Sequence, residues 1–303
     1  MKIAVTGSSG LIGTALVAAL RADGHQVTRL VRSGPAGDDT IAWDPRANGG
    51  GLDPRSLDGV AAVVHLAGAG VADRRWTESY KAEIRNSRVQ GTTALVSALT
   101  GMASPPGVLL CGSAIGWYGD IAGREVDESS PAGTGFLASV VRDWEAAAAP
   151  AKQAGIRVVT MRTGLVLSPN GGVLARLLPL FRLGLGARLG PGTQVISWIA
   201  LSELVAVMRF LLAREDIAGP VNATTPNPVT NREFTSVLAA TVHRPAVLTV
   251  PVPVLRTVIG GASGELLSSA RVLPRALLAA GYQYQHPGLA GALAAELAVT
   301  RPS

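Results

Sequence analysis

The feature that most constrains this chain is the glycine spacing in VTGSSGLIG at residues 5–13, directly after an apolar run. The glycines are Gly7, Gly10 and Gly13. A helix-forming run follows, and a second apolar run comes at 26–31. This order is typical of a β-α-β unit that holds a pyrophosphate at a helix N-terminus, where free N–H groups favour negative charge. Gly7 and Gly10 allow tight turning and Gly13 allows close helix–strand packing, while a glycine turn without a ligand is the alternative interpretation.

The first 165 residues alternate short apolar runs with helical patterns, which predicts a doubly wound parallel sheet of the Rossmann type in the α/β class. The predicted strands lack strict polar alternation, as expected for strands buried on both faces; they are 2–6, 26–31, 40–43, 60–66, 107–112 and 156–162. The predicted helices between them are 11–23, 77–100 and 136–154.

The pattern loosens after residue 165, and we predict two parts: a nucleotide-binding domain at 1–165 and a smaller, partly interleaved C-terminal region at 166–303. Segments near 195–225 are expected to return to the first domain. Helices are predicted near 172–183, 201–214, 231–242, 251–259 and 271–280, with short strands at 219–223 and 246–250.

Composition narrows the function classes. The net charge is +6, but the basic residues are dispersed, so no nucleic-acid partner is expected. No run of about 18 residues is apolar and free of charge, so no membrane partner is expected. A single cysteine suits a reducing compartment, and we expect a cytoplasmic protein. The four histidines and the cysteine show no metal-ligand spacing, so no metal site is expected.

The residue after the second predicted strand bears on cofactor choice. A site that prefers NAD usually has an acid there, which binds the ribose hydroxyls. Here Arg32 stands there, with no acid beside it. A guanidinium suits the 2′-phosphate of NADP, so NADP(H) is the predicted cofactor. A solvated arginine is the alternative.

Several phrases along nearly the whole chain resemble one family. They are RRWT, SRVQGT, GSAIGWYGD, RDWEAAA, MRTGLVL, PLFRLGLG, GPVNATTPNPVTNREF and RVLPRALLAAGY. With the glycine spacing, they resemble the atypical, epimerase-like branch of the short-chain dehydrogenase/reductase superfamily, whose members are often labelled epimerase family proteins. The resemblance implies a Rossmann-type sheet that binds NADP, with a substrate pocket under the C-terminal region.

The resemblance also implies a set of cofactor contacts. Glu83 could hold an arginine or a ribose, Arg88 stands where extended members have an asparagine facing the cofactor, and Leu165 should border the nicotinamide. For Leu66, Ala67 and Leu165, plain core packing is the alternative. The full set is Gly7, Ser8, Ser9, Gly10, Leu11 and Ile12 in the cradle, Arg32 and Ser33 at the adenosine phosphate, and Leu66, Ala67, Gly68, Glu83, Arg88 and Leu165.

The chain departs from the superfamily at the catalytic end. The usual Tyr-x-x-x-Lys pair would fall at Leu137 and Val141, or one residue earlier at Phe136 and Val140. Ser113 and Tyr118 remain as candidate catalytic residues, Ser113 as a substrate hydrogen-bonder and Tyr118 as acid or base. For both, a hydroxyl that satisfies loop backbone groups is the alternative.

Three other features are weighed. A histidine and an aspartate of the family phrase are replaced here by Ala200 and Ser202, which leaves Glu203. His65 lies on a buried strand and is expected to be a core residue. The glycines at 184 and 186 indicate a loop pressed against a neighbour such as the substrate region. The arginines at 176, 182 and 188 indicate either exposed charges beside an apolar face or a groove that binds a nucleic acid or an anionic substrate.

Two functions follow. The first is an NADP(H)-dependent oxidoreductase or epimerase-like enzyme with an altered acid/base group, acting on an unknown small molecule. The alternative is a non-catalytic NADP(H)-binding redox sensor or regulatory protein, favoured by the missing tyrosine and lysine. The oligomeric state is left open.

Overall fold

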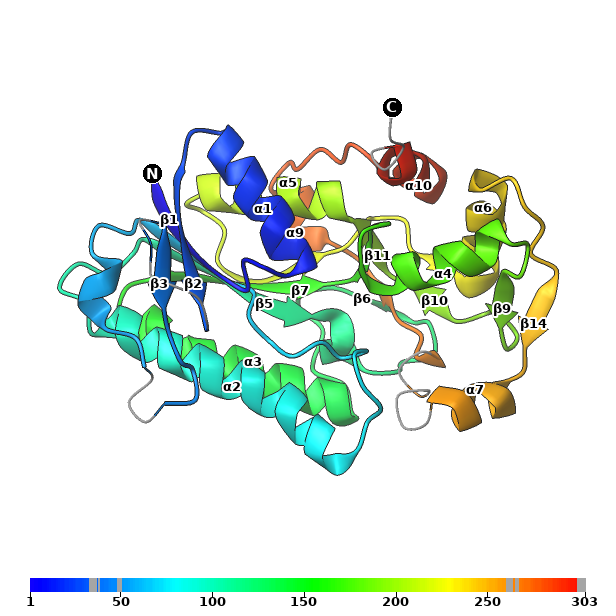
Figure 1. The fold of residues 1–303 in the computed structure, drawn as a ribbon, viewed down its shortest axis with the longest axis horizontal. Coiled ribbons are helices and arrows are strands. Elements are labelled where there is room, and N and C mark those ends of the chain that lie inside the picture. Colours follow the sequence, from blue (N-terminus) through cyan, green and yellow to red (C-terminus); the bar gives the residue numbers. More distant parts are fainter. Residues whose placement is uncertain (33–36, 38, 48–50, 260–263, 265–266, 299–303) are drawn as a thin grey trace.

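Seven parallel strands form the central sheet (Figure 1). The computed structural model describes residues 1–32, 37, 39–47, 51–259, 264 and 267–298. In spatial order the strands are β3 (Thr40–Ala42), β2 (Gln26–Val31), β1 (Lys2–Thr6), β4 (Ala62–His65), β5 (Val108–Ala114), β7 (Arg157–Thr163) and β12 (Gly219–Ala223). Each neighbouring pair is parallel.

The strand order reverses between β1 and β4. From β1 the chain moves outward to β2 and β3, and from β4 it moves the other way to β5, β7 and β12. In open parallel sheets, ligands bind in the crevice at the carboxyl ends of the strands where this reversal occurs. The glycine turn follows β1 and residues 66–68 follow β4, so the reversal places both at one crevice.

Helices cover both faces of the sheet, which confirms the prediction of a doubly wound α/β fold. One face packs against α1 (Leu11–Ala22), α5 (Leu201–Ala213) and α9 (Arg275–Ala279), and the other against α2 (Glu78–Thr100) and α3 (Phe136–Gln153) (Figure 1). Strand side chains alternate between the faces. In β1, Ile3 and Val5 join the α1 side, whereas Ala4 joins the α2 side.

A second hydrophobic core lies in the C-terminal region, around α4 (Gly172–Arg182), α6 (Asn231–Thr241) and α10 (Leu289–Ala298). Another helix there is α7 (Val252–Ile259), and two short 3₁₀ turns are η1 (Pro54–Leu57) and η2 (Ile115–Tyr118). Four two-stranded pairs complete the described elements: β8 (Leu165–Leu167) with β11 (Trp198–Ala200), β9 (Ala187–Leu189) with β14 (Leu248–Val250), β10 (Val195–Ile196) with β13 (Val229–Thr230), and β6 (Glu125–Val126) with β15 (Arg271–Val272).

The two parts are interleaved along the chain. Helix α5 packs against α1, and β12 extends the main sheet beside β7, although both come from the second half of the sequence. The helix predicted over 271–280 is wrong at its start, because Arg271 and Val272 pair with β6 and only Arg275–Ala279 is helical. Pro274 stands just before that helix, where a proline's fixed φ is tolerated. Within the described part of the chain, no helix is both long and apolar enough to cross a bilayer.

Candidate cofactor site

The glycine turn after β1 forms a tight cradle. Gly7 has φ of +64°, and a Cβ atom there would lie 2.7 Å from the carbonyl carbon of Leu66. A Cβ atom at Gly13 would lie 2.2 Å from the carbonyl oxygen of Gly7. Larger residues would therefore push the turn away from β4 or from the start of α1.

Helix α1 begins in the cradle without a capping side chain. Its N-cap residue, Gly10, supplies no side-chain hydrogen bond, and its first turn holds no acidic residue. The first N–H groups of a helix have no partner within the helix, and the helix dipole makes that end positive. This N-terminus is therefore suited to an anion such as a pyrophosphate.

A cleft of about 540 Å³ opens beside the cradle. The predicted cofactor residues that line it are Gly7, Ser8, Ser9, Gly10, Arg32, Leu66, Ala67 and Gly68. The cleft also takes in Arg29 from β2, Trp43 and Arg46 from the chain after β3, and Gln90 from α2. Among the described residues that line it there are three arginines and no carboxylate, so the wall favours an anionic ligand.

Strand β2 and the residue that follows it supply two of those arginines. Arg29 is half-buried and donates from Nε to the Ser8 hydroxyl at 3.3 Å, whereas Arg32 is exposed at the end of the strand. Val31 lies between them in the cleft wall. Because residues two apart on a strand point to the same side, Arg29 and Val31 share the side that faces the cradle.

The other predicted cofactor residues lie outside the cleft wall. Leu11 packs against Gly171 at the start of α4, Ile12 packs in the core beside α5, and Leu165 packs in the second core. Glu83 forms an ion pair with Arg46, not with Arg88. Ser33 lies outside the described residues.

Arg88 lies directly behind the turn that follows β4. Its Nη1 donates to the carbonyl oxygens of Ala69 at 2.9 Å and Ile84 at 3.0 Å, and the guanidinium stands over the Trp144 ring, 5.0 Å from its centroid. Burial lowers the pKa of Arg88 to about 10, so it stays charged at neutral pH. It forms no ion pair with any described carboxylate, which leaves a half-buried positive charge behind Gly68.

His65 stabilises the same turn through the Thr6 hydroxyl. The Thr6 hydroxyl oxygen accepts the N–H groups of Leu66 at 3.1 Å and Ala67 at 3.2 Å, so its own proton goes to His65 Nδ1 at 2.7 Å. The imidazole therefore carries its proton on Nε2, which donates to Thr92 Oγ1 at 3.0 Å. Burial lowers the pKa of His65 to about 4, and the prediction that His65 is a core residue is confirmed by its complete burial.

At the catalytic end, the places of the missing pair are packed with apolar side chains. Leu137 and Val141 lie on α3 beneath η2, and a Cβ atom at Gly116 would lie 3.2 Å from the Leu137 Cβ. One helical turn further along α3 stands Glu145, which shares that face of the helix. Glu145 accepts from Ser113 Oγ at 2.6 Å, so the Ser113 hydroxyl donates inward.

Glu145 is also clamped by a buried arginine. Arg162 donates from Nε to Glu145 Oε1 at 2.9 Å and from Nη2 to Oε2 at 3.0 Å. The guanidinium carbon lies 3.9 Å from the centroid of the Trp117 ring, and Nη1 donates to the Tyr118 hydroxyl at 3.1 Å. The sequence showed Glu145 and Arg162 only as parts of family phrases, because their partners lie 17 to 45 residues away in the chain.

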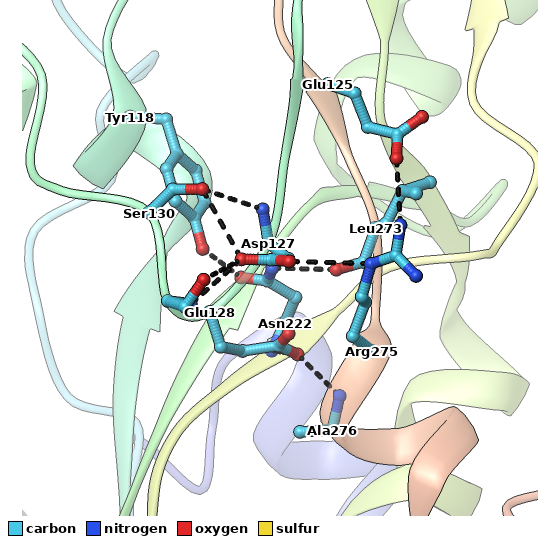
Figure 2. A network of polar contacts seen from close by, with 10 residues as sticks. Tyr118, Glu125, Asp127, Glu128, Ser130, Asn222, Leu273, Arg275 and Ala276 are labelled. Carbon is cyan, nitrogen blue, oxygen red and sulfur yellow. Dashed lines mark hydrogen bonds and ion pairs between the residues drawn. The ribbon is translucent and has the colours of Figure 1, made fainter.

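Tyr118 points into a polar network that joins three segments (Figure 2). Its hydroxyl donates to Asn222 Oδ1 at 2.7 Å, and the side chain is 1% exposed. Asn222 in turn donates to the Leu273 carbonyl at 2.9 Å, and Glu128 accepts the backbone N–H groups of Asn222 at 2.9 Å and Ala276 at 3.3 Å. Burial raises the pKa of Tyr118, although Arg162 acts in the opposite direction.

The residues that replace the family histidine and aspartate serve the fold. Ala200 is buried at the end of β11, and Ser202 bonds through its hydroxyl to Glu296 at 2.7 Å. Glu203 is buried and accepts from the Tyr282 hydroxyl at 2.5 Å and from the His286 N–H at 2.7 Å.

Comparison with known proteins agrees with this geometry. A sequence profile described as the NAD dependent epimerase/dehydratase family matches residues 3–223, and a domain of unknown function, DUF1731, matches residues 250–296. The chain belongs to the NAD dependent epimerase/dehydratase family. The profile spans β1 to β12, so it includes the cradle, the cleft and the Ser113–Glu145–Arg162 cluster.

Individual members of this family resemble the chain over nearly its whole length. An epimerase family protein of Mycobacterium tuberculosis is 47% identical over 99% of this chain and 98% of its own length. The crystal structure of human epimerase family protein SDR39U1 with NADPH is 32% identical, with a TM-score of 0.87 and coverage of 97% of this chain and 98% of that one. A nucleoside-diphosphate sugar epimerase of Corynebacterium glutamicum is 36% identical with a TM-score of 0.81, covering 98% of this chain and 58% of that one.

The family pattern alone did not reveal Arg29 or Arg46. Arg29 stands two residues before Val31 in a strand, and this spacing was the available signal for a side chain on the ligand side. Arg46 follows the short strand β3, and only the three-dimensional arrangement brings it to the cleft.

Proposed function

We propose that the cleft binds NADP(H) with its adenosine 2′-phosphate beside Arg29 and Arg32. The observation that carries the proposal is the wall of the cleft, where Val31 and Arg32 stand at the end of β2 and no described lining residue is a carboxylate. A carboxylate there would bind the free ribose hydroxyls of NAD and repel the phosphate of NADP. Ser33 remains part of the proposed phosphate site.

The remaining predicted residues take supporting roles in this proposal. The cradle residues Gly7 to Gly10 and the start of α1 hold the pyrophosphate, with Leu11 and Ile12 fixing the helix. Leu66, Ala67 and Gly68 face the cofactor at the reversal point, and Arg88 adds a positive charge behind them. Leu165 borders the nicotinamide, and Glu83 steers Arg46 at the mouth. The human relative crystallised with NADPH supports the choice of phosphorylated cofactor.

The test is a titration of the purified chain with NADPH and NADH, followed by nicotinamide fluorescence. We expect NADPH to bind more tightly, and Arg32→Ala to weaken NADPH by about tenfold or more, because a charge-assisted hydrogen bond contributes about 1.5–3 kcal/mol. Arg55→Ala is the matched control, since Arg55 is exposed on η1 outside the cleft. Equal losses for NADH and NADPH in Arg32→Ala would remove the assignment.

At the nicotinamide end we propose an NADP(H)-dependent oxidoreductase or epimerase-like enzyme with an unknown small-molecule substrate. Bound cofactor would accept or supply a hydride, and the chain would orient the substrate. Ser113 is the proposed substrate contact. Because its proton is given to Glu145, it offers lone pairs to the substrate, which suits a hydroxyl or amine donor.

A non-catalytic NADP(H)-binding sensor or regulatory protein is the second candidate. Two observations favour it: apolar residues fill the tyrosine and lysine places, and the Tyr118 hydroxyl is already bonded to Asn222 and Arg162. For Tyr118 to act as the acid or base, it would have to leave one of these partners. A screen of alcohols and carbonyls, followed by NADPH absorbance, separates the two functions, because a sensor would turn over none of them.

A cytoplasmic location is part of the same proposal. Its support is Cys111, a buried free thiol, which suits a reducing compartment.

A further inference from the structure

Exposed apolar side chains gather at one edge of the C-terminal region. We define this apolar edge as five residues from two segments. Leu180, Leu183 and Leu185 lie in the last turn of α4 or just after it, and Val247 and Leu248 lie just before and at the start of β14. Leu183 is 72% exposed and Val247 is 84% exposed. Apart from the apolar edge, the large apolar side chains exposed in the described part of the chain are Met1, Val254 and Leu278.

Strand pairing brings the two segments of the apolar edge together. Leu248 in β14 pairs with Ala187 in β9, just after the turn that carries Leu183 and Leu185. The Arg244 Nε also donates to the Arg182 carbonyl at 3.1 Å. In Figure 1, the end of α4, β9 and β14 lie together at the right-hand end of the molecule.

Two glycines turn the leucines outward. Gly184 has φ of +74°, and a Cβ atom at Gly186 would lie 2.7 Å from the Phe181 ring. The loop is therefore pressed against Phe181 of its own core. The contact with Phe181 accounts for Gly186, and the positive φ accounts for Gly184. The leucines on either side of Gly184 are left exposed, Leu183 at 72% and Leu185 at 51%.

The sequence around the apolar edge is rich in arginine and poor in acids. Residues 171–202 and 234–264 contain no aspartate or glutamate. The acids next to these ranges in the sequence are Glu203, which is buried, Glu233, which is exposed at the start of α6, and Glu265. Arg182, Arg188 and Arg244 carry positive charge along the edge. None of the three forms an ion pair with a described carboxylate, and the Arg188 Nε is buried without a hydrogen-bond partner.

We propose that the apolar edge docks this protein peripherally on a bilayer that carries anionic lipids. Leucine and valine side chains would enter the headgroup boundary, while the arginines, which form no ion pair with a described carboxylate, would bind lipid phosphates and anionic headgroups. A second copy of the chain is a poorer occupant, because a two-fold contact would bring together two copies of the same arginine-rich surface. This proposal departs from the expectation of no membrane partner, which was based on the lack of a long apolar run; docking at the surface requires no such run.

The test is co-sedimentation of the full chain with vesicles of phosphatidylcholine alone or of phosphatidylcholine with phosphatidylserine. We expect binding only to the phosphatidylserine vesicles, and weaker binding as salt is raised. Arg182→Gln should weaken binding about fivefold, and Leu183→Asp or Val247→Asp should weaken it about tenfold or more, since each loses apolar contact and adds a repelled charge.

Leu278→Asp is the matched control, because Leu278 is 48% exposed on α9, where it lies outside the apolar edge. It adds the same charge and should keep wild-type binding, with unchanged thermal melting in all variants. The proposal is overturned if phosphatidylserine vesicles are not bound, or if Leu278→Asp loses as much binding as Leu183→Asp. It is also overturned if the chain binds no vesicles and ultracentrifugation shows a dimer that the Leu183→Asp substitution dissociates.

Discussion

The buried ion pair between Glu145 and Arg162 gives a prediction whose size follows from its geometry. The two side chains are 13% and 3% exposed and meet through two parallel hydrogen bonds. Arg162 also bonds to Tyr118 and stacks on Trp117. Glu145→Gln keeps the shape of the side chain but leaves the guanidinium buried without a counter-charge.

Breaking one side of a buried pair costs about 3–5 kcal/mol, because the remaining charge loses its partner without regaining water. Glu145 keeps slight exposure, and glutamine can still accept one hydrogen bond from Arg162. We therefore expect the lower end of the range, a loss of about 3 kcal/mol in the free energy of unfolding. Glu125→Gln is the matched control: Glu125 pairs with Arg275, both side chains are more than half exposed, and the expected loss is below about 1 kcal/mol.

The assay is urea unfolding followed by far-UV circular dichroism for both variants. Similar small losses for Glu145→Gln and Glu125→Gln would refute the argument that burial sets the cost. A second comparison uses apolar replacement: Glu145→Leu combined with Arg162→Met should be more stable than Glu145→Leu alone, because no charge is then left buried. A double variant that is less stable than Glu145→Leu would count against the same reasoning.

Three further predictions concern the cofactor turn and the polar network. The pKa of His65 is about 4 in the folded state and 6.5 in the unfolded state, so the unfolded state binds more protons between these pH values. The contribution of the neutral His65 to stability is therefore complete above pH 6.5 and falls by about 3 kcal/mol as the pH drops to 4. Urea unfolding from pH 7 to 4 should show this slope, and His65→Gln should reduce it; an unchanged slope would contradict the assignment. Gly13→Ala should abolish NADPH binding, since its Cβ would lie 2.2 Å from Gly7 O, whereas Gly10→Ala, whose Cβ would lie 3.4 Å from the same atom, should still fold; equal behaviour in thermal melts would refute the steric argument. Tyr118→Phe should lower stability by about 1–3 kcal/mol, through the partners left unpaired on Asn222 and Arg162, and leave NADPH affinity unchanged; a fully stable variant that loses turnover would instead favour the acid/base role.

The sequence alone was enough for the parallel sheet and the position of the cradle. Short apolar runs separated by amphipathic helices admit few arrangements, and the glycines of VTGSSGLIG fit only where backbones approach closely. These are local properties, so strand and helix positions such as β1, α2 and α3 lie within a few residues of their predicted bounds. The missing tyrosine and lysine were likewise visible in the sequence.

Other features depend on segments that are distant in the chain. The strand at 271–272 could not be predicted, because its pairing partner β6 lies about 145 residues earlier. The cleft gains Arg46 only because β3 lies beside β2, and the apolar edge exists only because β14 pairs with β9. A local pattern carries no information about such neighbours.

The hydroxyl groups of Ser113 and Tyr118 show most clearly what could not be predicted from the sequence. From the sequence, Ser113 was placed at the end of the fifth strand and Tyr118 five residues further on, both as hydroxyl groups available for chemistry. The tertiary structure decided what each hydroxyl bonds to: Glu145 for Ser113, and Asn222 and Arg162 for Tyr118. Residue type and strand position are fixed by the sequence, but the partner of a buried polar group is chosen by whichever donor or acceptor the packed elements bring within about 3 Å.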